Sequence, residues 1–293
     1  MRVGFIGVGA MGEPMAANLL KKGFEVSILQ HRRAEPVARL SALGATAKAD
    51  VAQAVQGCEV IVLSLPTSRE VEAVMAGSRG IVACAQSGSV VVDCSTSDPQ
   101  STRALGKQLG VRGIGLVDAG MTRGVAGAKQ GTLAFFLGGE QRHIERAMPV
   151  LKALGDTFVH LGPSGDGHTA KVISNVLSYG TVALVNEAFM LGARAGLDLK
   201  VLYDALMQGA PSKALESFGP RIASGDYEPP RVTIEHVCED LVLAQSMAAS
   251  GSAPIFMLSA AQEIYRLLAL RGEGAADMSK IAQLWRDASA ARE

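Results

Sequence analysis

The chain has 293 residues, which is long for a single hydrophobic core and predicts two domains. Hydrophobic residues make up 48% and charged residues 19%, the proportions of a folded globular protein rather than a disordered one. The 28 basic residues are balanced by 28 acidic ones, and this lacks the basic excess typical of nucleic-acid-binding proteins. We therefore expect no nucleic-acid partner.

Cysteine usage and hydropathy favour a cytoplasmic protein. The four cysteines form no CxxC pair and none lies at metal-ligand spacing from a histidine, so we expect reduced thiols and no bound metal: Cys58, Cys84, Cys94 and Cys238. The first apolar run, Val3 to Val8, is too short for a signal peptide. No stretch approaches the roughly 20 apolar residues of a membrane-spanning helix, and we expect no membrane contact.

Short apolar runs alternate with helix-like segments along the first half of the chain. The expected strands are Arg2–Ile6, Glu25–Leu29, Val60–Leu65, Val90–Asp93, Leu116–Asp118, Leu133–Leu137 and Thr157–Leu161. The expected helices between them are Met11–Lys22, Ala34–Leu43, Asp50–Val55, Ser68–Met75, Pro99–Leu109 and His143–Leu154. Strand, helix and strand at this spacing predict an α/β fold with a doubly wound parallel sheet.

The second half of the chain is predicted to be all-helical. It begins after the turn-rich segment Pro163–Gly167, with a long helix from about Gly167 to Ala195. Further helices are expected at Lys200–Gln208, Ala214–Ala223, Val232–Ala249, Pro254–Leu270 and Met278–Arg286. We therefore expect a domain over residues 1–163 and an all-α domain over residues 164–293, joined by the long helix.

A glycine-rich motif follows the first expected strand and opens a helix. It runs Gly7-Val8-Gly9-Ala10-Met11-Gly12. Gly7 allows a tight turn, Gly9 lets the backbone approach a pyrophosphate, and Gly12 lets the helix pack close to the sheet. The helix N-terminus then offers N–H groups to phosphate. The motif predicts a Rossmann domain that binds a dinucleotide; a glycine-rich turn with no ligand is the alternative.

The end of the second strand bears on cofactor choice. An acidic residue there would bind the ribose 2′-hydroxyl of NAD, but the sequence is Gln30-His31-Arg32-Arg33. A guanidinium suits a 2′-phosphate, so we expect His31, Arg32 and Arg33 to favour NADP over NAD. If these arginines are a solvated helix start, NAD remains open.

Seven ordered stretches resemble one family over nearly the whole chain. They are Gly7–Leu19; Leu65-Pro66-Thr67-Ser68; Asp93-Cys94-Ser95-Thr96; Asp118–Gly124, similar to the family's "DAPVSGG" loop, with Gly131-Thr132-Leu133 after it; Gly165–Asn175, similar to "GxGxxxKxxxN"; Glu239-Asp240-Leu241, where the family has "KDL"; and Asp277-Met278-Ser279. The family is that of the β-hydroxyacid dehydrogenases, the group of 3-hydroxyisobutyrate dehydrogenase and its glyoxylate or succinic semialdehyde reductase relatives.

The resemblance implies a Rossmann half, a long interdomain helix and a helical domain often used for dimerisation. It also implies reversible hydride transfer between NAD(P) and a small 3-hydroxyacid-type alcohol and its aldehyde. It puts the cofactor near Leu65, Pro66, Thr96 and Asp240. It puts the substrate near Thr122, Arg123, Gly124, Asn175 and Glu239, with Lys171 as the catalytic residue.

Residue chemistry supports this role for Lys171. It lies near the start of the long helix, and Asn175, four residues on, projects from the same face. Hydride transfer to a carbonyl creates a developing alkoxide, which an ammonium stabilises and protonates. In the oxidation direction neutral lysine would act as the base. A solvated lysine at a helix start is the alternative.

Three positions depart from the family pattern. Thr122 replaces serine and keeps a hydroxyl donor. Arg123 replaces a glycine, so its side chain either points away or clamps a substrate carboxylate. Glu239 replaces a lysine and reverses the local charge, which would repel an acid substrate unless Arg123 compensates. One hypothesis pairs Glu239 with Arg123; a second is a neutral or amine-bearing substrate; a third is that Glu239 is exposed and irrelevant.

Two other functions compete with the dehydrogenase. Imine reductases share this architecture but commonly lack the catalytic lysine, so Lys171 argues against them. A sensor that binds NADP without turnover would not need Lys171 or Asn175. The apolar helical segments Val172–Ala188 and Ile255–Leu270 exceed what one small domain needs, so we expect a homodimer or homotetramer.

Overall fold

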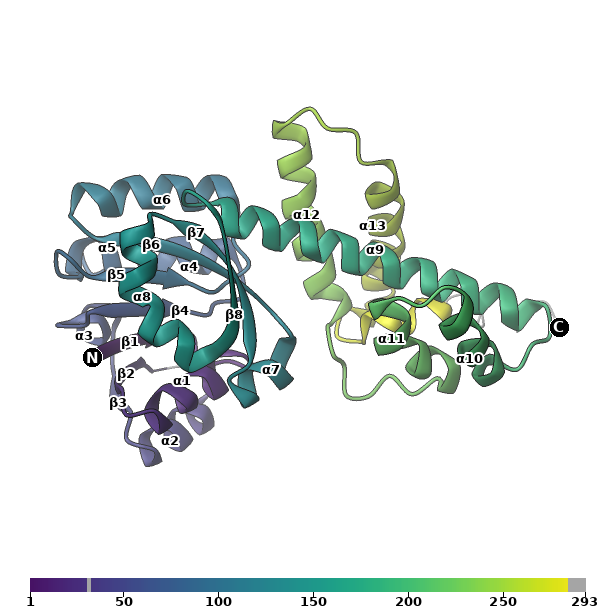
Figure 1. Cartoon of the computed structure of the whole chain (residues 1–293), viewed down its shortest axis with the longest axis horizontal. Helices are drawn as coiled ribbons and strands as arrows, with labels where there is room; N and C mark the ends of the chain where they lie inside the picture. The colour runs from purple at the N-terminus through teal and green to yellow at the C-terminus, as the bar shows by residue number, and fades with distance from the viewer. Residues whose placement is uncertain (31–32, 284–293) are drawn as a thin grey trace. The chain divides into compact units, whose positions relative to one another are not determined.

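The computed structural model describes residues 1–30 and 33–283. Eight strands form one sheet in the order β3-β2-β1-β4-β5-β6-β7-β8 (Figure 1). Their bounds are β1 Arg2–Ile6, β2 Glu25–Leu29, β3 Thr46–Lys48, β4 Val60–Leu63, β5 Val90–Asp93, β6 Gly115–Thr122, β7 Leu133–Gly139 and β8 Gly155–Gly162. The predicted α/β sheet is confirmed, with β3 as a short strand that the sequence pattern did not reveal.

Helices cover both faces of the sheet, which explains the unbroken apolar strands. Every residue of β4 and β5 is buried. One core joins the sheet to α1 (Gly12–Lys21), α2 (Ala34–Ala42), α7 (Gly124–Gln130) and α8 (Gln141–Leu154). The other joins it to α3 (Val51–Val55), α4 (Ser68–Met75), α5 (Ile81–Cys84) and α6 (Pro99–Val111).

Two strands depart from the predicted parallel arrangement, because β7 and β8 run opposite to β1–β6. β7 pairs antiparallel with β6, while β1 to β6 pair in parallel and β8 is parallel to β7. Only residues 123–132 connect β6 to β7, and α7 takes up most of them. A parallel crossover needs a dozen residues or more to return to the opposite edge, so this connection turns back instead.

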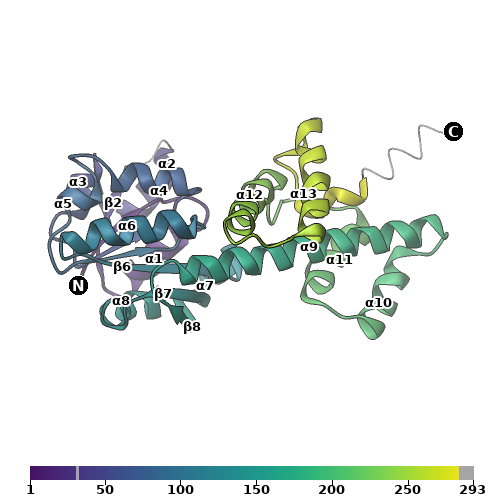
Figure 2. The same ribbon diagram turned by 90° about the horizontal axis from the view of Figure 1, so that it is seen from above.

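The second half is helical, as predicted. Its helices are α9 (Asp166–Arg194), α10 (Leu199–Gly209), α11 (Lys213–Ser224), α12 (Ile234–Ser250) and α13 (Phe256–Leu268). A π-helical turn, Ala269–Glu273, and a short 3-10 helix, Met278–Lys280, follow; the last expected helix extends into residues outside the described ranges. α12 lies beside α13 in both views (Figures 1 and 2), and both share a core with α9 and α11.

By internal contacts the chain divides into two compact units, residues 1–171 and 172–293. Helix α9 therefore begins in the first unit and continues as the central helix of the second. Unlike the sequence expectation, α9 is long and apolar enough to span a membrane by length and composition alone. Its buried polar side chains Asn175 and Asn186 hydrogen-bond within the helical unit, as the core helix of a folded domain requires.

Candidate active site

The predicted cofactor loops converge at one edge of the sheet in the first unit. The register aligns Ile6 with Leu63, Leu63 with Asp93, and Asp93 with Asp118. The loops after β1, β4 and β5 therefore start side by side, and β6 runs on to Thr122 next to them. The chain order reverses between β1 and β4, and ligands of doubly wound sheets bind outside the carboxyl ends at such a switch point.

The glycine motif has the geometry that a dinucleotide needs. Gly7 has a φ of 101°, and a Cβ there would lie 2.1 Å from the Ser64 carbonyl oxygen. A Cβ on Gly12 would lie 1.8 Å from the Gly7 oxygen, whereas nothing in the described part of the chain lies within 4 Å of one on Gly9. No described side chain caps the N-terminus of α1. The open side at Gly9 and the uncapped helix end fit a pyrophosphate.

The region after β2 is only partly described. His31 and Arg32, two of the three residues expected to select NADP, lie outside the described residues. Arg33 is exposed and precedes α2. Nearby, Arg39 of α2 makes a bidentate ion pair with Glu13 of α1, at 2.6 and 2.9 Å. The hydrogen bond from Arg39 is the largest cause that lowers the pKa of Glu13.

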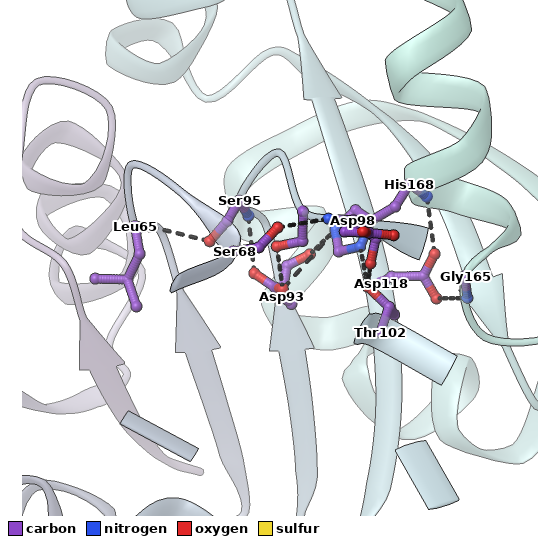
Figure 3. A network of polar contacts seen from close by, with 10 residues as sticks. Leu65, Ser68, Asp93, Ser95, Asp98, Thr102, Asp118, Gly165 and His168 are labelled. Atoms are coloured by element: carbon purple, nitrogen blue, oxygen red, sulfur yellow. Dashed lines mark hydrogen bonds and ion pairs between the residues drawn. The ribbon is translucent and has the colours of Figure 1, made fainter. Parts of the chain in front are cut away.

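A buried carboxylate organises the loop after β5 (Figure 3). Asp93 accepts hydrogen bonds from the Ser95 backbone N–H at 2.9 Å and from the Ser97 hydroxyl at 2.9 Å. The Ser95 hydroxyl in turn accepts from the Leu65 N–H at 3.0 Å, which joins the β4 and β5 loops. Half-buried Thr96 lies between the two held serines, so its backbone position is fixed.

A second buried carboxylate holds the start of α9. Asp118 is fully buried and accepts hydrogen bonds from the backbone N–H groups of Gly165, at 2.8 Å, and His168, at 2.9 Å (Figure 3). A carboxylate at a helix N-terminus satisfies N–H groups that the helix leaves open and interacts favourably with its dipole. Asp118 therefore ties α9 to β6.

His168 links the two carboxylate loops. Its fully buried ring lies with Nε2 at 3.2 Å from the Asp93 carbonyl oxygen and Nδ1 at 2.8 Å from the Thr102 hydroxyl (Figure 3). A carbonyl can only accept, so Nε2 donates to the Asp93 carbonyl oxygen, while Nδ1 is hydrogen-bonded to the Thr102 hydroxyl, which itself donates to the Asp98 carbonyl oxygen at 3.0 Å. The start of α9 is thus bonded to β5, β6 and α6.

This anchoring sets the position of Lys171. Its stem packs against β6, where a Cβ on Gly120 would lie 2.5 Å from the Lys171 Cβ and 3.1 Å from its Cγ. Glycine at position 120 therefore leaves the space that the Lys171 side chain occupies. Gly120 stands where the family motif has proline, and here it forms the surface on which the predicted catalytic lysine rests.

The loop after β6 contains the other substrate residues of the first unit. The Thr122 hydroxyl oxygen accepts from the Arg123 N–H at 2.8 Å, so its proton remains to be donated elsewhere. Arg123 adopts a left-handed φ of 78°, the conformation that glycine supplies in the family motif. Exposed Gly124 follows with a φ of 58°.

The guanidinium of Arg123 binds groups of its own unit. It donates to the Thr132 carbonyl at 2.6 Å, to Asp156 at 2.6 Å and to the Thr157 hydroxyl at 2.9 Å. The hydrogen bonds from Thr157 and then from Arg123 lower the pKa of Asp156. Of the two alternatives for Arg123, these contacts fit a side chain that points away.

In the helical unit, the predicted residues Asn175 and Asp240 contact each other. The buried Asp240 Oδ2 accepts from the Asn175 amide at 2.7 Å and from the Tyr179 hydroxyl at 2.6 Å. Exposed Glu239 is the neighbour of Asp240 on α12, and its carboxylate lies 4.0 Å from His236 Nδ1. His236 Nε2 lies 3.5 Å from Asp240 Oδ2, so one ring faces both carboxylates.

Several residues that organise these loops have roles that appear only in the structure. Asp93 and Asp118 lie within quoted motifs, and their positions at strand ends were the available signal. Their bonding partners come from distant segments: Asp118 accepts from Gly165 and His168, and Asp240 accepts from Tyr179. A local sequence pattern does not predict pairs that lie so far apart along the chain.

Comparison with known proteins adds independent evidence. The family model described as the NAD binding domain of 6-phosphogluconate dehydrogenase matches residues 2–162. That of the NAD-binding of NADP-dependent 3-hydroxyisobutyrate dehydrogenase matches residues 165–285. The chain is 35% identical over 292 residues to an NAD-dependent L-serine dehydrogenase of Pseudomonas aeruginosa, with 97% of each covered.

Solved structures agree with this. A 3-hydroxyisobutyrate dehydrogenase of Mycobacterium tuberculosis, solved with L-serine, is 27% identical with a TM-score of 0.88, over 97% of this chain and 99% of that one. An imine reductase from Pseudomonas sp. is 19% identical with a TM-score of 0.60, over 96% and 98%, and shares the fold alone. The matches to the two family models, over residues 2–162 and 165–285, and to the relative at 35% identity over 97% of the chain show that the chain belongs to the β-hydroxyacid dehydrogenase family.

Proposed function

We propose that the chain is an NADP-dependent dehydrogenase that interconverts a small 3-hydroxyacid-type alcohol and its aldehyde or semialdehyde, with Lys171 as general acid and base. The single observation that carries this proposal is the anchored start of α9. There the Lys171 stem rests on Gly120, at the sheet edge where the glycine motif and the β4, β5 and β6 loops converge. The domain roles follow: residues 1–163 hold the cofactor and residues 164–293 contribute to substrate binding and self-association.

A bound nicotinamide supplies or accepts the hydride. Lys171 acts on the oxygen of the reacting carbon: its ammonium donates a proton as the aldehyde is reduced, and its neutral amine accepts one as the alcohol is oxidised. The positive charge also stabilises the oxygen as it develops negative charge. Asn175, on the next turn of the same helix, binds and orients the substrate.

The substrate carboxylate binds at the loop after β6. Thr122 donates its hydroxyl proton, because its oxygen already accepts from the Arg123 N–H. Arg123 and Gly124 contribute this loop's left-handed backbone, which shapes the binding surface. Because the Arg123 guanidinium binds Asp156, Thr157 and the Thr132 carbonyl, we assign it to the loop's support rather than to a clamp.

The cofactor binds at the carboxyl edge of the sheet. The pyrophosphate would be held by the glycine motif Gly7, Val8, Gly9, Ala10, Met11 and Gly12. The nicotinamide side would be held by Leu65, Pro66 and Thr96, and a 2′-phosphate by His31, Arg32 and Arg33, which would favour NADP. Asp240 holds Asn175, so its influence on the cofactor is indirect. Glu239 is next to Asp240, which bonds Asn175, and it brings a second negative charge to this region. This charge would repel a second acidic group on the substrate, so we expect a substrate with a single carboxylate.

The neighbouring hypotheses are weaker. Imine reductases resemble the chain only in fold, and a sensor has no use for a lysine anchored by two buried carboxylate networks. We also propose a cytoplasmic homo-oligomer, supported by an exposed apolar row on α9 that consists of Ile173, Leu177, Leu184 and Leu191.

The first experiment follows NADPH and NADH oxidation with glyoxylate, succinic semialdehyde, methylmalonate semialdehyde and uncharged analogues. We expect turnover with NADPH on the acidic aldehydes. Lys171→Ala should lower kcat by about 10²- to 10⁴-fold, the usual contribution of a general acid or base, and leave NADPH affinity unchanged. Lys107→Ala, which removes an exposed lysine of α6, is the control.

Two results would reject the proposal. A Lys171→Ala variant with wild-type kcat would remove the lysine from the chemistry. A wild-type protein that binds NADPH tightly but turns over no aldehyde on the panel would favour imine reduction or sensing instead. Turnover of uncharged aldehydes alone would mean that Glu239 has changed the substrate class.

A further inference from the structure

We propose that Tyr179 is a positioning residue of the active site: its buried hydroxyl holds Asp240, and Asp240 sets the orientation of the Asn175 amide. This inference rests on the proposed function, which gives Asn175 the substrate. Tyr179 itself contacts neither substrate nor cofactor in this account. It acts through two hydrogen bonds that meet on one carboxylate oxygen.

The geometry of the three side chains is the basis for this inference. Tyr179 Oη donates to Asp240 Oδ2 at 2.6 Å, and Asn175 Nδ2 donates to the same oxygen at 2.7 Å. Tyr179 is 5% exposed, Asp240 3% and Asn175 7%, so water competes poorly for these hydrogen bonds. Hydrogen bonds to a buried ionised group are short and strong, as these are.

Two donors on one oxygen fix the rotation of the carboxylate. With Oδ2 held between Tyr179 and Asn175, the Asp240 side chain has one favourable orientation. The amide nitrogen of Asn175 then faces α12, and because the amide group is planar and trigonal, the direction of its carbonyl oxygen is fixed as well. The direction in which Asn175 presents each of its polar atoms is therefore set by Asp240.

A competing partner makes the tyrosine necessary. His236 Nε2 also lies near Asp240 Oδ2, at 3.5 Å, and its side chain is 43% exposed. Without the Tyr179 hydroxyl, the carboxylate could turn toward the imidazole and water at that exposed side. The Tyr179 donor therefore keeps Asp240 on the side of Asn175.

Tyr179 is itself held and stays protonated. The Tyr265 hydroxyl of α13 donates to the Tyr179 carbonyl at 3.1 Å, and Tyr265 is fully buried. Burial, and then the neighbouring Asp240 charge, raise the pKa of Tyr179 well above its usual value. The hydroxyl is consequently a donor at every pH at which the enzyme can be assayed.

A purely structural tyrosine would give different results from a positioning one. Tyr179→Phe removes one oxygen and leaves the ring packing intact. Tyr203→Phe is the matched control: Tyr203 packs its ring against Gly219 in the same unit, and its hydroxyl has no hydrogen-bond partner among the described residues. Both variants should be compared with the wild type for melting temperature, NADPH affinity, kcat and KM.

We expect Tyr179→Phe to lower kcat/KM by about tenfold or more, the size of effect expected for losing a hydrogen bond to a charged group. Tyr203→Phe should change neither kinetic constant. In an Asn175→Ala background, Tyr179→Phe should cause no further loss, because its effect passes through Asn175. A lower melting temperature with unchanged kcat and KM, or a full additional loss in that background, would overturn the proposal.

A readout independent of turnover separates this inference from the proposed function. With ¹⁵N-asparagine labelling, the Asn175 side-chain NH₂ signals are identified by their absence from Asn175→Ala. They should move in Tyr179→Phe and stay in place in Tyr203→Phe. If they move while the wild type turns over no hydroxyacid or aldehyde, the positioning network stands and the proposed function fails; if they do not move, the network fails.

Discussion

At the residue scale, the space for the predicted catalytic lysine depends on a glycine, Gly120, which has no side chain. The Lys171 stem lies where a Cβ on Gly120 would be, and the closest atom is the Lys171 Cβ rather than the mobile end of the side chain. Any larger residue at position 120 must therefore displace α9 or β6. The lysine's placement is a property of this strand–helix contact and not of Lys171 alone.

Gly120→Ala tests that contact. A new Cβ at 2.5 Å from Lys171 Cβ should shift the start of α9 and lower kcat by about tenfold or more, since small misplacements of catalytic groups are costly. NADPH affinity, measured by fluorescence titration, should stay close to the wild-type value. The control is Gly110→Ala in α6, where nothing in the described part of the chain lies within 4 Å of the new Cβ. Equal kcat values for the two variants would contradict this account.

The sequence could identify Lys171 and Asn175 but not what holds them. Motif spacing puts both on one helix, and this helix is present. Asp118, His168 and Tyr179 act through contacts that join residues about fifty or more positions apart, so they emerge only from the tertiary fold. For the same reason the Arg123 partners Asp156 and Thr157, on a later strand, could not be deduced, and the sequence left both alternatives for Arg123 open.

At the scale of elements, the loop between β1 and α1 combines a structural glycine and an open one. Gly12 packs its backbone against Gly7, whereas Gly9 faces open space. Substitution by alanine should therefore affect ligand binding at Gly9 and the stability of the fold at Gly12. The two variants distinguish a glycine that the ligand requires from one that the packing requires.

Gly9→Ala should leave the melting temperature of the free protein unchanged and weaken NADPH binding by about tenfold, because its methyl group occupies the proposed approach of the pyrophosphate. Gly12→Ala should instead destabilise the fold by about 2–3 kcal/mol, the cost of overpacking a tight contact. Thermal denaturation with and without NADPH measures both effects. A large loss of stability in Gly9→Ala, with NADPH affinity intact, would refute the assignment of its open side to the cofactor.

Strands and helices were predictable where the local sequence pattern decides the structure. The buried runs of β4 and β5 and the periodic helices were predictable, and their bounds agree to within a few residues. The direction of β7 was not, because it depends on the length of the connection after β6 and on where that connection can reach. β3, with only three residues, is too short for an alternation of apolar and polar positions to be recognised.

At the scale of the whole molecule, the helical unit presents apolar side chains that its own core does not bury. Ile173, Leu177, Leu184 and Leu191 recur along α9 at intervals of four and seven residues, so they line one face of the helix. Their exposures are 58, 71, 52 and 67%, whereas Val172, Val182 and Phe189 on the other face are buried. Such a continuous row is costly in water, and a second copy of the same chain would cover it.

Leu184→Glu tests this proposed self-association. Light scattering coupled to size-exclusion chromatography should give at least twice the monomer mass for the wild type. The glutamate places a charge in the middle of the row, where it would be buried unpaired in an interface, so the variant should shift toward the monomer. Val111→Glu makes the same change at a residue of α6 that is 88% exposed and should keep the wild-type mass. A monomeric wild type, or an unchanged mass for Leu184→Glu, would mean that this face of α9 does not mediate association.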